Sequence, residues 1–202
     1  MTKPDRRTER TRAALMSAFV AALLSEGYDA VTVEGVAAKA NVGRSTFYMH
    51  YTGKDDILRQ SLARPSSVLA GLVGNVLPPG ALAKQLLHFH DQRRRNHIFF
   101  EGAARKIWVA CLAGLIEPRL AALVRHARAR PVLPLPLAAL QIAEGQIALV
   151  ANWLTVRPSV KVELVGEALS ATTRAQAAAL LGLAPDAPLL IPGERLTVRE
   201  GP

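Results

Sequence analysis

Two short helical patterns that nearly touch constrain the fold of this chain more than any other feature of its sequence. Thr32 is placed as the N-cap of the first pattern, residues 33–40, whose apolar face consists of valine and alanine. Asn41 follows, and asparagine adopts the left-handed backbone conformation nearly as readily as glycine. The second pattern, residues 42–51, begins at the next residue. Because two helices joined this tightly must cross steeply, the stretch predicts a helix-turn-helix.

The second helix of the pair would present two different faces at the 3.6-residue helical period. We expect one face to pack inward through its apolar and aromatic residues, Val42, Phe47 and Tyr51. The other face projects a guanidinium, a hydroxyl and a phenol, from Arg44, Ser45 and Tyr48. Such groups suit phosphates and base edges. We therefore interpret this helix as the recognition helix of a DNA-binding domain.

The overall charge favours a polyanionic partner. The formal net charge is +9 and the sequence pI is about 10.4, although surplus arginine also occurs on ordinary solvated surfaces. Four arginines crowd the first turns of the first predicted helix: Arg6, Arg7, Arg10 and Arg12. The helix dipole disfavours cations at that end. A phosphate partner would explain their presence there, and a solvated helix start is the alternative.

The rest of the chain predicts an all-α fold, because no alternating strand pattern interrupts the helical periodicity. The first helix should run from about residue 5 or residue 8 to residue 26, with Gly27 as its stop. Another helix should open at Lys54, and Pro118 should kink its helix or mark a helix start. Further helices are expected at about 80–94, 97–105, 106–129, 136–156 and 159–181.

Residues 8–62 resemble the N-terminal domain of TetR-family transcriptional regulators. The resemblance rests on several short pieces at matching offsets, which are Gly27-Tyr28, Thr32-Val33, Val36-Ala37, Ala40-Asn41-Val42, Ser45-Thr46-Phe47-Tyr48, His50-Tyr51 and Lys54. Two positions depart from the family pattern. Asn41 stands where the family usually has glycine, and Gly43 stands where it usually has a capping serine, which weakens the start of the recognition helix.

The resemblance implies an all-α homodimer that binds palindromic operator DNA, usually as a repressor, and is released by a small-molecule effector. It divides the chain into a DNA-binding domain (1–53), a helical effector-binding and dimerisation domain (54–182) and an extended or disordered tail (183–202). The last two long helices match in position the family's dimer-forming pair, and small residues such as Ala171, Ala175 and Ala178 would permit close packing. The alternative is a small-molecule-binding or enzyme-like helical protein that binds no specific operator.

We expect seven residues to contact DNA, namely Thr32, Arg44, Ser45, Thr46, Tyr48, His50 and Lys54. Arg44 can pair bidentately with guanine or can contact a phosphate, and Thr46 can contact DNA or pack internally. We expect Tyr48 and His50 to contact phosphates. Lys54 combines an ammonium with the N–H groups of a helix start, which also suits a phosphate.

A pocket for an effector, expected to be apolar, is predicted in the C-terminal helices. Its candidate residues form an aromatic and apolar set with one polar anchor: Phe89, Phe99, Phe100, Trp108, Leu112, Gln146 and Trp153. Residues of this kind at helical spacing also form ordinary hydrophobic cores, so a plain core is the alternative.

Other classes of site are not indicated by the sequence. His88 and His90 are two residues apart and point to different faces of a helix, so we expect no metal site. Cys111 lies in an apolar segment and should be an inert thiol. No catalytic constellation stands out, so we expect no enzyme and no cofactor. We also expect no signal peptide and no apolar run long enough to cross a membrane, hence a cytoplasmic protein.

Overall fold

The computed structural model describes residues 6–74, 76–93, 97–156, 160–184 and 187–191. Its helices, in chain order, are α1 (Arg6–Glu26), α2 (Val33–Lys39), α3 (Arg44–Tyr48), α4 (Lys54–Ser61), α5 (Ala63–Ala70), α6 (Ala81–Asp91), the 3-10 helix η1 (His97–Phe100), α8 (Gly102–Ala127), α9 (Leu135–Thr155) and α10 (Val162–Leu180). No strand occurs among these described residues, and the predicted all-α class is confirmed.

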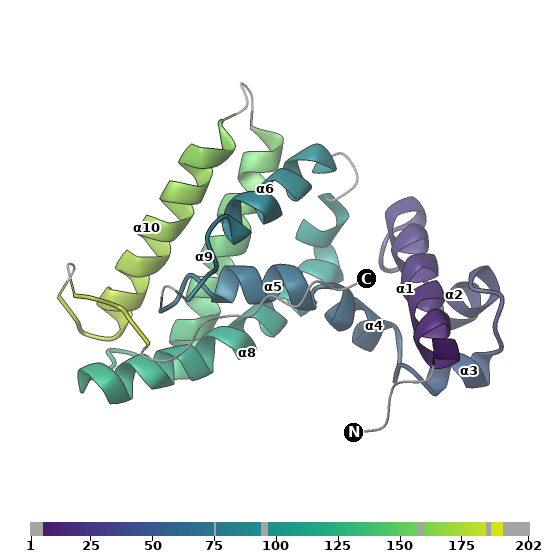
Figure 1. Cartoon of the computed structure of the whole chain (residues 1–202), viewed down its shortest axis with the longest axis horizontal. Coiled ribbons are helices and arrows are strands. Elements are labelled where there is room, and N and C mark those ends of the chain that lie inside the picture. Colours follow the sequence, from purple (N-terminus) through teal and green to yellow (C-terminus); the bar gives the residue numbers. More distant parts are fainter. Residues whose placement is uncertain (1–5, 75, 94–96, 157–159, 185–186, 192–202) are drawn as a thin grey trace.

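The three N-terminal helices form a small bundle at one end of the molecule (Figure 1). α1 and α3 each pack against α2, and the shared core includes Leu15, Phe19 and Phe47, all of which are fully buried. Gly27 ends α1 with φ +84°, a left-handed conformation that glycine adopts without strain. The predicted first helix and its stop are therefore present in the structure.

Helix α4 joins this bundle to the rest of the molecule. It contacts α1 on one side and α8 on the other, and it buries Ile57 and Leu58 completely. Leu62 forms a turn between α4 and α5, with φ −89° and ψ −3°, and Pro65 lies in the first turn of α5. A proline is tolerated in that turn because the first N–H groups of a helix have no intrahelical partner.

The C-terminal helices enclose the second part of the core. α9 packs along α8 and also contacts α10, while α5 lies against α8 and α6 against α10 (Figure 1). α8 is a single helix of 26 residues, so the predicted division into 97–105 and 106–129 is wrong. Its buried residues recur every three or four positions, from Ala104 through Trp108 to Leu123, which gives one continuous apolar face.

Pro118 lies inside α8, exposed on its outer side, and is not a helix start. The residue four positions earlier, whose carbonyl a proline ring crowds, is Gly114, which is also exposed. The carbonyl that loses its hydrogen bond there can be solvated. This explains how the helix continues through a proline.

Two other sequence expectations also change. Ala178 is fully buried in the core, whereas Ala171 and Ala175 are exposed, so these three alanines do not share one packing face.

By length and composition alone, α8 and α9 are apolar enough to cross a membrane, contrary to the expectation from the sequence. That criterion is weak, because core helices of soluble proteins also meet it, and half of the apolar window of α9 is buried inside the fold.

The described part of the C-terminal tail contains no helix, as predicted, yet it packs against the core. Leu189 is buried, and Ile191 lies where a side chain on Gly74 would stand, 2.5 Å from the position of an added Cβ. Gly74 also has φ +90°, so glycine is required there both by the backbone conformation and by this close approach.

Candidate functional site

The turn between α2 and α3 has the geometry that the sequence predicts. The Thr32 hydroxyl accepts a hydrogen bond from the Gly35 N–H at 3.1 Å and caps α2. Asn41 has φ +54°, which is the left-handed conformation expected of the turn residue. Gly43 stands at the N-cap of α3 without a side-chain cap, so α3 begins without that stabilising hydrogen bond.

The two faces of the recognition segment are separated as predicted. Phe47 and Tyr51 are buried, with ring centroids 5.6 Å apart, and Val42 packs beside them at the edge of the core. Three polar residues project outward on α3 and are exposed: Arg44, Ser45 and Tyr48. The α3 helix itself is only five residues long, Arg44–Tyr48, so its exposed surface consists mostly of these side chains.

Arg44 is held beside the preceding helix by an ion pair. Its guanidinium Nη1 lies 3.1 Å from Oε1 of Glu34 on α2, and both side chains are more than half exposed. Water screens such a pair strongly, so it orients the guanidinium more than it stabilises the fold. A base or phosphate that approaches Arg44 must compete with Glu34.

Lys54 does not project into solvent, although the sequence predicts that its ammonium faces a phosphate. The Lys54 Nζ donates hydrogen bonds to the carbonyl oxygens of Tyr28, Asp29 and Val31, at 3.3, 3.4 and 3.3 Å. It also lies 4.7 Å from the centroid of the Tyr28 ring, a cation–π contact. These contacts tie α4 to the loop between α1 and α2. A phosphate contact by Lys54 stays a prediction.

The Tyr28 hydroxyl completes this junction by hydrogen bonding to the Asp55 carboxylate. Burial, together with that carboxylate, raises the pKa of Tyr28 above its ordinary value. The tyrosine therefore stays neutral and acts as a hydrogen-bond donor.

Of the remaining predicted DNA contacts, Thr46 lies in α3, His50 follows α3 by two residues, and Thr32 caps α2. Thr32 is exposed at the start of α2, while Thr46 and His50 are half-buried. The His50 ring lies 6.4 Å from the Tyr51 ring. Thr46 is thus partly packed, so both of its predicted roles stay open.

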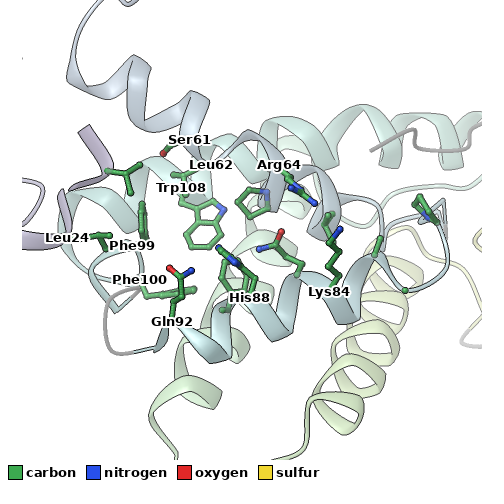
Figure 2. A pocket seen from close by; sticks show the side chains of 18 of the residues that line it. Leu24, Ser61, Leu62, Arg64, Lys84, His88, Gln92, Phe99, Phe100 and Trp108 are labelled. Atoms are coloured by element: carbon green, nitrogen blue, oxygen red, sulfur yellow. The ribbon is translucent and has the colours of Figure 1, made fainter. Parts of the chain in front are cut away.

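A cavity of about 860 Å³ lies between the N-terminal bundle and the C-terminal helices. Figure 2 shows Leu24 of α1, Ser61 of α4 and Arg64 of α5 on its walls together with the aromatic side chains. Four of the seven predicted pocket residues line it, and these are Phe89, Phe99, Phe100 and Trp108. The structure thus brings together residues from α6, η1 and α8 that lie up to twenty positions apart.

The other three predicted pocket residues do not line the cavity and serve the core instead. Leu112 is fully buried on α8. Gln146 donates to the Leu69 carbonyl at 3.1 Å and to the Thr173 hydroxyl at 3.0 Å, so its amide links α5, α9 and α10. Trp153 donates to the Val160 carbonyl and stacks on another side chain, the His90 ring, at 5.5 Å. Each of these contacts is made away from the cavity.

Several lining residues were missed from the sequence. They come from α1, α5 and α6 and include Val20, Leu24, Arg64, Lys84, Gln85, His88 and Gln92. No local pattern could single them out, because the cavity forms only where residues of α1 meet residues that follow them by more than thirty positions. The Pro78-Pro79-Gly80 run, which predicts only a turn, also borders the cavity.

The described residues hold no cluster of three or more His, Cys, Asp or Glu side chains that could bind a metal ion. Cys111 is half-buried, and burial raises the pKa of its thiol, which disfavours the reactive thiolate.

The N-terminal bundle is similar in sequence to known proteins. Residues 15–60 match the family model described as bacterial regulatory proteins, tetR family. An uncharacterised HTH-type transcriptional regulator from Bacillus subtilis, YxbF, is 39% identical over 61 residues, which are 30% of this chain. The chain covers only 16% of the length of that relative.

The whole chain also resembles solved structures in its fold. A TetR transcriptional regulator from Streptococcus agalactiae superposes with a TM-score of 0.51 and 22% identity, covering 84% of this chain and 96% of that one. The similarity in fold therefore includes the C-terminal helices as well as the N-terminal bundle. Residues 15–60 thus match the tetR family of bacterial regulatory proteins, and the chain shares the fold of a TetR transcriptional regulator beyond that segment.

Proposed function

We propose that this chain is a cytoplasmic repressor that binds a palindromic operator as a homodimer and leaves it when a small molecule fills the central cavity. The observation that carries this proposal is the composition of the cavity wall. Val20 and Leu24 of α1 line it together with residues of α5, α6 and α8. A bound molecule would contact the DNA-binding bundle and the C-terminal helices at once.

This arrangement gives ligand release a physical basis. A ligand can shift an equilibrium only if it binds two conformations with different affinity. Because the cavity lies between two parts of the molecule, any change in their spacing changes its shape. A ligand that fits one spacing would disfavour the other, including the spacing that operator binding requires.

On the DNA side, we propose that Arg44 and Ser45 contact base edges, while Tyr48 and His50 contact the sugar-phosphate backbone. Thr32 and Thr46 would contact the backbone at the margins of α3. Lys54 would take part through its backbone N–H at the start of α4, since its ammonium already binds three carbonyl oxygens. The exposed arginines at the start of α1 add positive charge beside this surface.

We propose that two copies associate through α9 and α10. A stripe of exposed apolar residues runs along α10 at helical spacing and consists of Leu164, Ala168, Ala171 and Ala175. Small side chains let two helices approach closely. A two-fold dimer would place two α3 helices in successive major grooves, about 34 Å apart, which is why the operator should be a palindrome.

Footprinting and gel-shift assays on the DNA that flanks the gene test this function. We expect protection of a palindrome, with an affinity that falls steeply as salt rises because phosphate contacts release counterions. A compound that occupies the cavity should abolish the protection. If no palindrome is protected even at low salt, the repressor proposal is wrong, and a small-molecule-binding protein without a specific operator becomes the better reading.

A further inference from the structure

We infer that the ligand of the central cavity is an aromatic organic anion, with its ring among the buried aromatic side chains and its acidic group toward Arg64. The inference rests on the proposed function only in taking this cavity as the effector site. It also refines the sequence expectation of an apolar effector, because the cavity has one charged end. Its volume of about 860 Å³ suits a ligand of drug-like size.

The sign of the ligand's charge follows from the cavity lining. Arg64 and Lys84 are the ionised side chains on the wall, and no described residue of the lining is acidic. Arg64 is exposed and makes no hydrogen bond or ion pair with any residue that the structure describes. His88 and Gln92 add polar groups to the lining. A carboxylate would find a guanidinium able to bind it bidentately, whereas an amine would meet only repulsion.

The aromatic character of the ligand follows from the side chains at the end of the cavity away from Arg64. Phe89, Phe99 and Phe100 surround Trp108, with ring centroids 5.8, 6.5 and 4.9 Å from it. The Phe89 and Phe99 rings meet the indole edge to face. An aromatic ring that enters this group can continue the same edge-to-face packing, which an alkyl chain cannot. Figure 2 shows Phe99 and Phe100 at one end of the cavity and Arg64 and Lys84 at the other.

Trp108 supplies a third, independent observation. Its indole Nε1–H is fully buried and donates to no acceptor among the described residues, although the side chain lines the cavity. Buried donors are normally paired, and each exception calls for an explanation. In Figure 2 the nitrogen lies on the side of the ring that faces Arg64. An oxygen of the ligand placed between the indole and the guanidinium would satisfy this donor.

Isothermal titration calorimetry of the full chain with three matched probes tests the inference. The probes are 2-naphthoate, neutral 2-naphthamide and cationic 2-naphthylmethylammonium, which share one ring system and differ in charge. We expect 2-naphthoate to bind at least tenfold more tightly than 2-naphthamide, and the ammonium to bind most weakly. Equal binding of all three, tighter binding of the ammonium, or no binding of any probe at 1 mM would overturn the inference.

Two variants locate the interaction within the cavity. Arg64→Gln should remove most of the preference for naphthoate over naphthamide, while Arg125→Gln, an exposed arginine near the end of α8, should leave it intact. Trp108→Phe keeps an aromatic ring and removes the N–H, and it should weaken naphthoate binding about fivefold. A preference that survives Arg64→Gln would contradict the placement of the acidic group, whether or not Trp108→Phe folds.

The calorimetric measurement uses no DNA, so its failure can be told apart from a failure of the proposed function. Probe binding with the expected charge preference would support the inference even if no operator were found. An operator that is bound specifically, by a chain that discriminates none of the probes, would leave the repressor proposal standing and reject the ligand class.

Discussion

Arg44 of α3 forms an ion pair with Glu34 of α2, and this pair affects how Arg44 can contact DNA. Its ion pair with Glu34 is exposed and adds little stability, yet it fixes where the guanidinium points before DNA arrives. A bidentate contact with guanine needs the same two nitrogens that a carboxylate can occupy. Binding a base therefore means exchanging Glu34 for that base.

We expect Arg44→Ala to change the sequence preference of the protein, with a loss of about 1–3 kcal/mol at one base position of the operator. Tyr48→Phe is the matched comparison, because Tyr48 is also exposed on α3 and its hydroxyl is proposed to contact a phosphate. It should weaken binding to all sequences alike. Binding measured against a set of single-base operator variants distinguishes the two, and an unchanged preference in Arg44→Ala would refute base readout.

Phe47 lies one residue from Tyr48 but has the opposite role, since it is fully buried between α1, α2 and α3. We expect Phe47→Ala to destabilise the chain by about 3–5 kcal/mol, through lost burial and the cavity it leaves. Chemical denaturation checks this value, and DNA binding should be lost because the domain unfolds. Met49→Ala, at an exposed position of the same segment, should change stability by less than about 0.5 kcal/mol.

At the scale of elements, the side chain of Asp56 stabilises the start of α4 by binding the backbone that precedes the helix. The Asp56 carboxylate accepts a hydrogen bond from the Thr52 N–H at 2.9 Å and another from Gln60 at 3.2 Å. The backbone hydrogen bond is the main reason that the pKa of Asp56 lies below its ordinary value. The negative charge also suits the N-terminal end of the helix dipole.

The sign of the resulting pH dependence follows from that lowered pKa. The stabilisation is fully present above the pKa of the unfolded carboxyl, near 4, and is lost as pH falls through the lower pKa of the folded state. We expect Asp56→Ala to cost about 0.5–1 kcal/mol at pH 7, a value typical of a partly exposed cap. The difference from the unsubstituted chain should shrink toward zero in denaturation experiments below pH 4. A cost that stays constant with pH would show that charge is not involved.

Which face of α10 is buried depends on the helices that pack against it and not on its composition alone. α10 contacts both α9 and α6, which buries Val165, Leu169 and Ala178 and leaves another stripe exposed. The alanines of α10 therefore divide between a core face and an outer face. Only the outer stripe is available to a second copy.

At the scale of the whole molecule, the proposed dimer would let two helix-turn-helix domains contact one operator. Ala168→Glu places a charge in the middle of the exposed α10 stripe, and we expect it to weaken self-association at least a hundredfold. Sedimentation equilibrium measures this change. Ala110→Glu, at an exposed position of α8, is the control and should leave association unchanged. A dimer that tolerates the glutamate at 168 would place the interface elsewhere.

The amino-acid sequence by itself determined the helix-turn-helix and most of the helices around it. The Thr32 cap and the left-handed Asn41 depend on contacts within a few residues, and the inward direction of Phe47 follows from the helical period, so local patterns are enough to predict them. The sequence also singled out Phe89, Phe99, Phe100 and Trp108, because aromatic residues among apolar helices are conspicuous. In each case the signal lies in neighbouring positions.

Only the tertiary structure decided what the long-range contacts are. The sequence offers Lys54 as a cation for phosphate, yet the fold turns its ammonium onto three carbonyl oxygens of a loop more than twenty residues away. Gln146 likewise binds within the core instead of facing a ligand. The cavity is lined by residues of α1, α5 and α6 that only the fold brings together, and Arg64 acquires its place on the cavity wall in the same way. Packing between distant segments has no local period, and for that reason periodicity and spacing could not predict it.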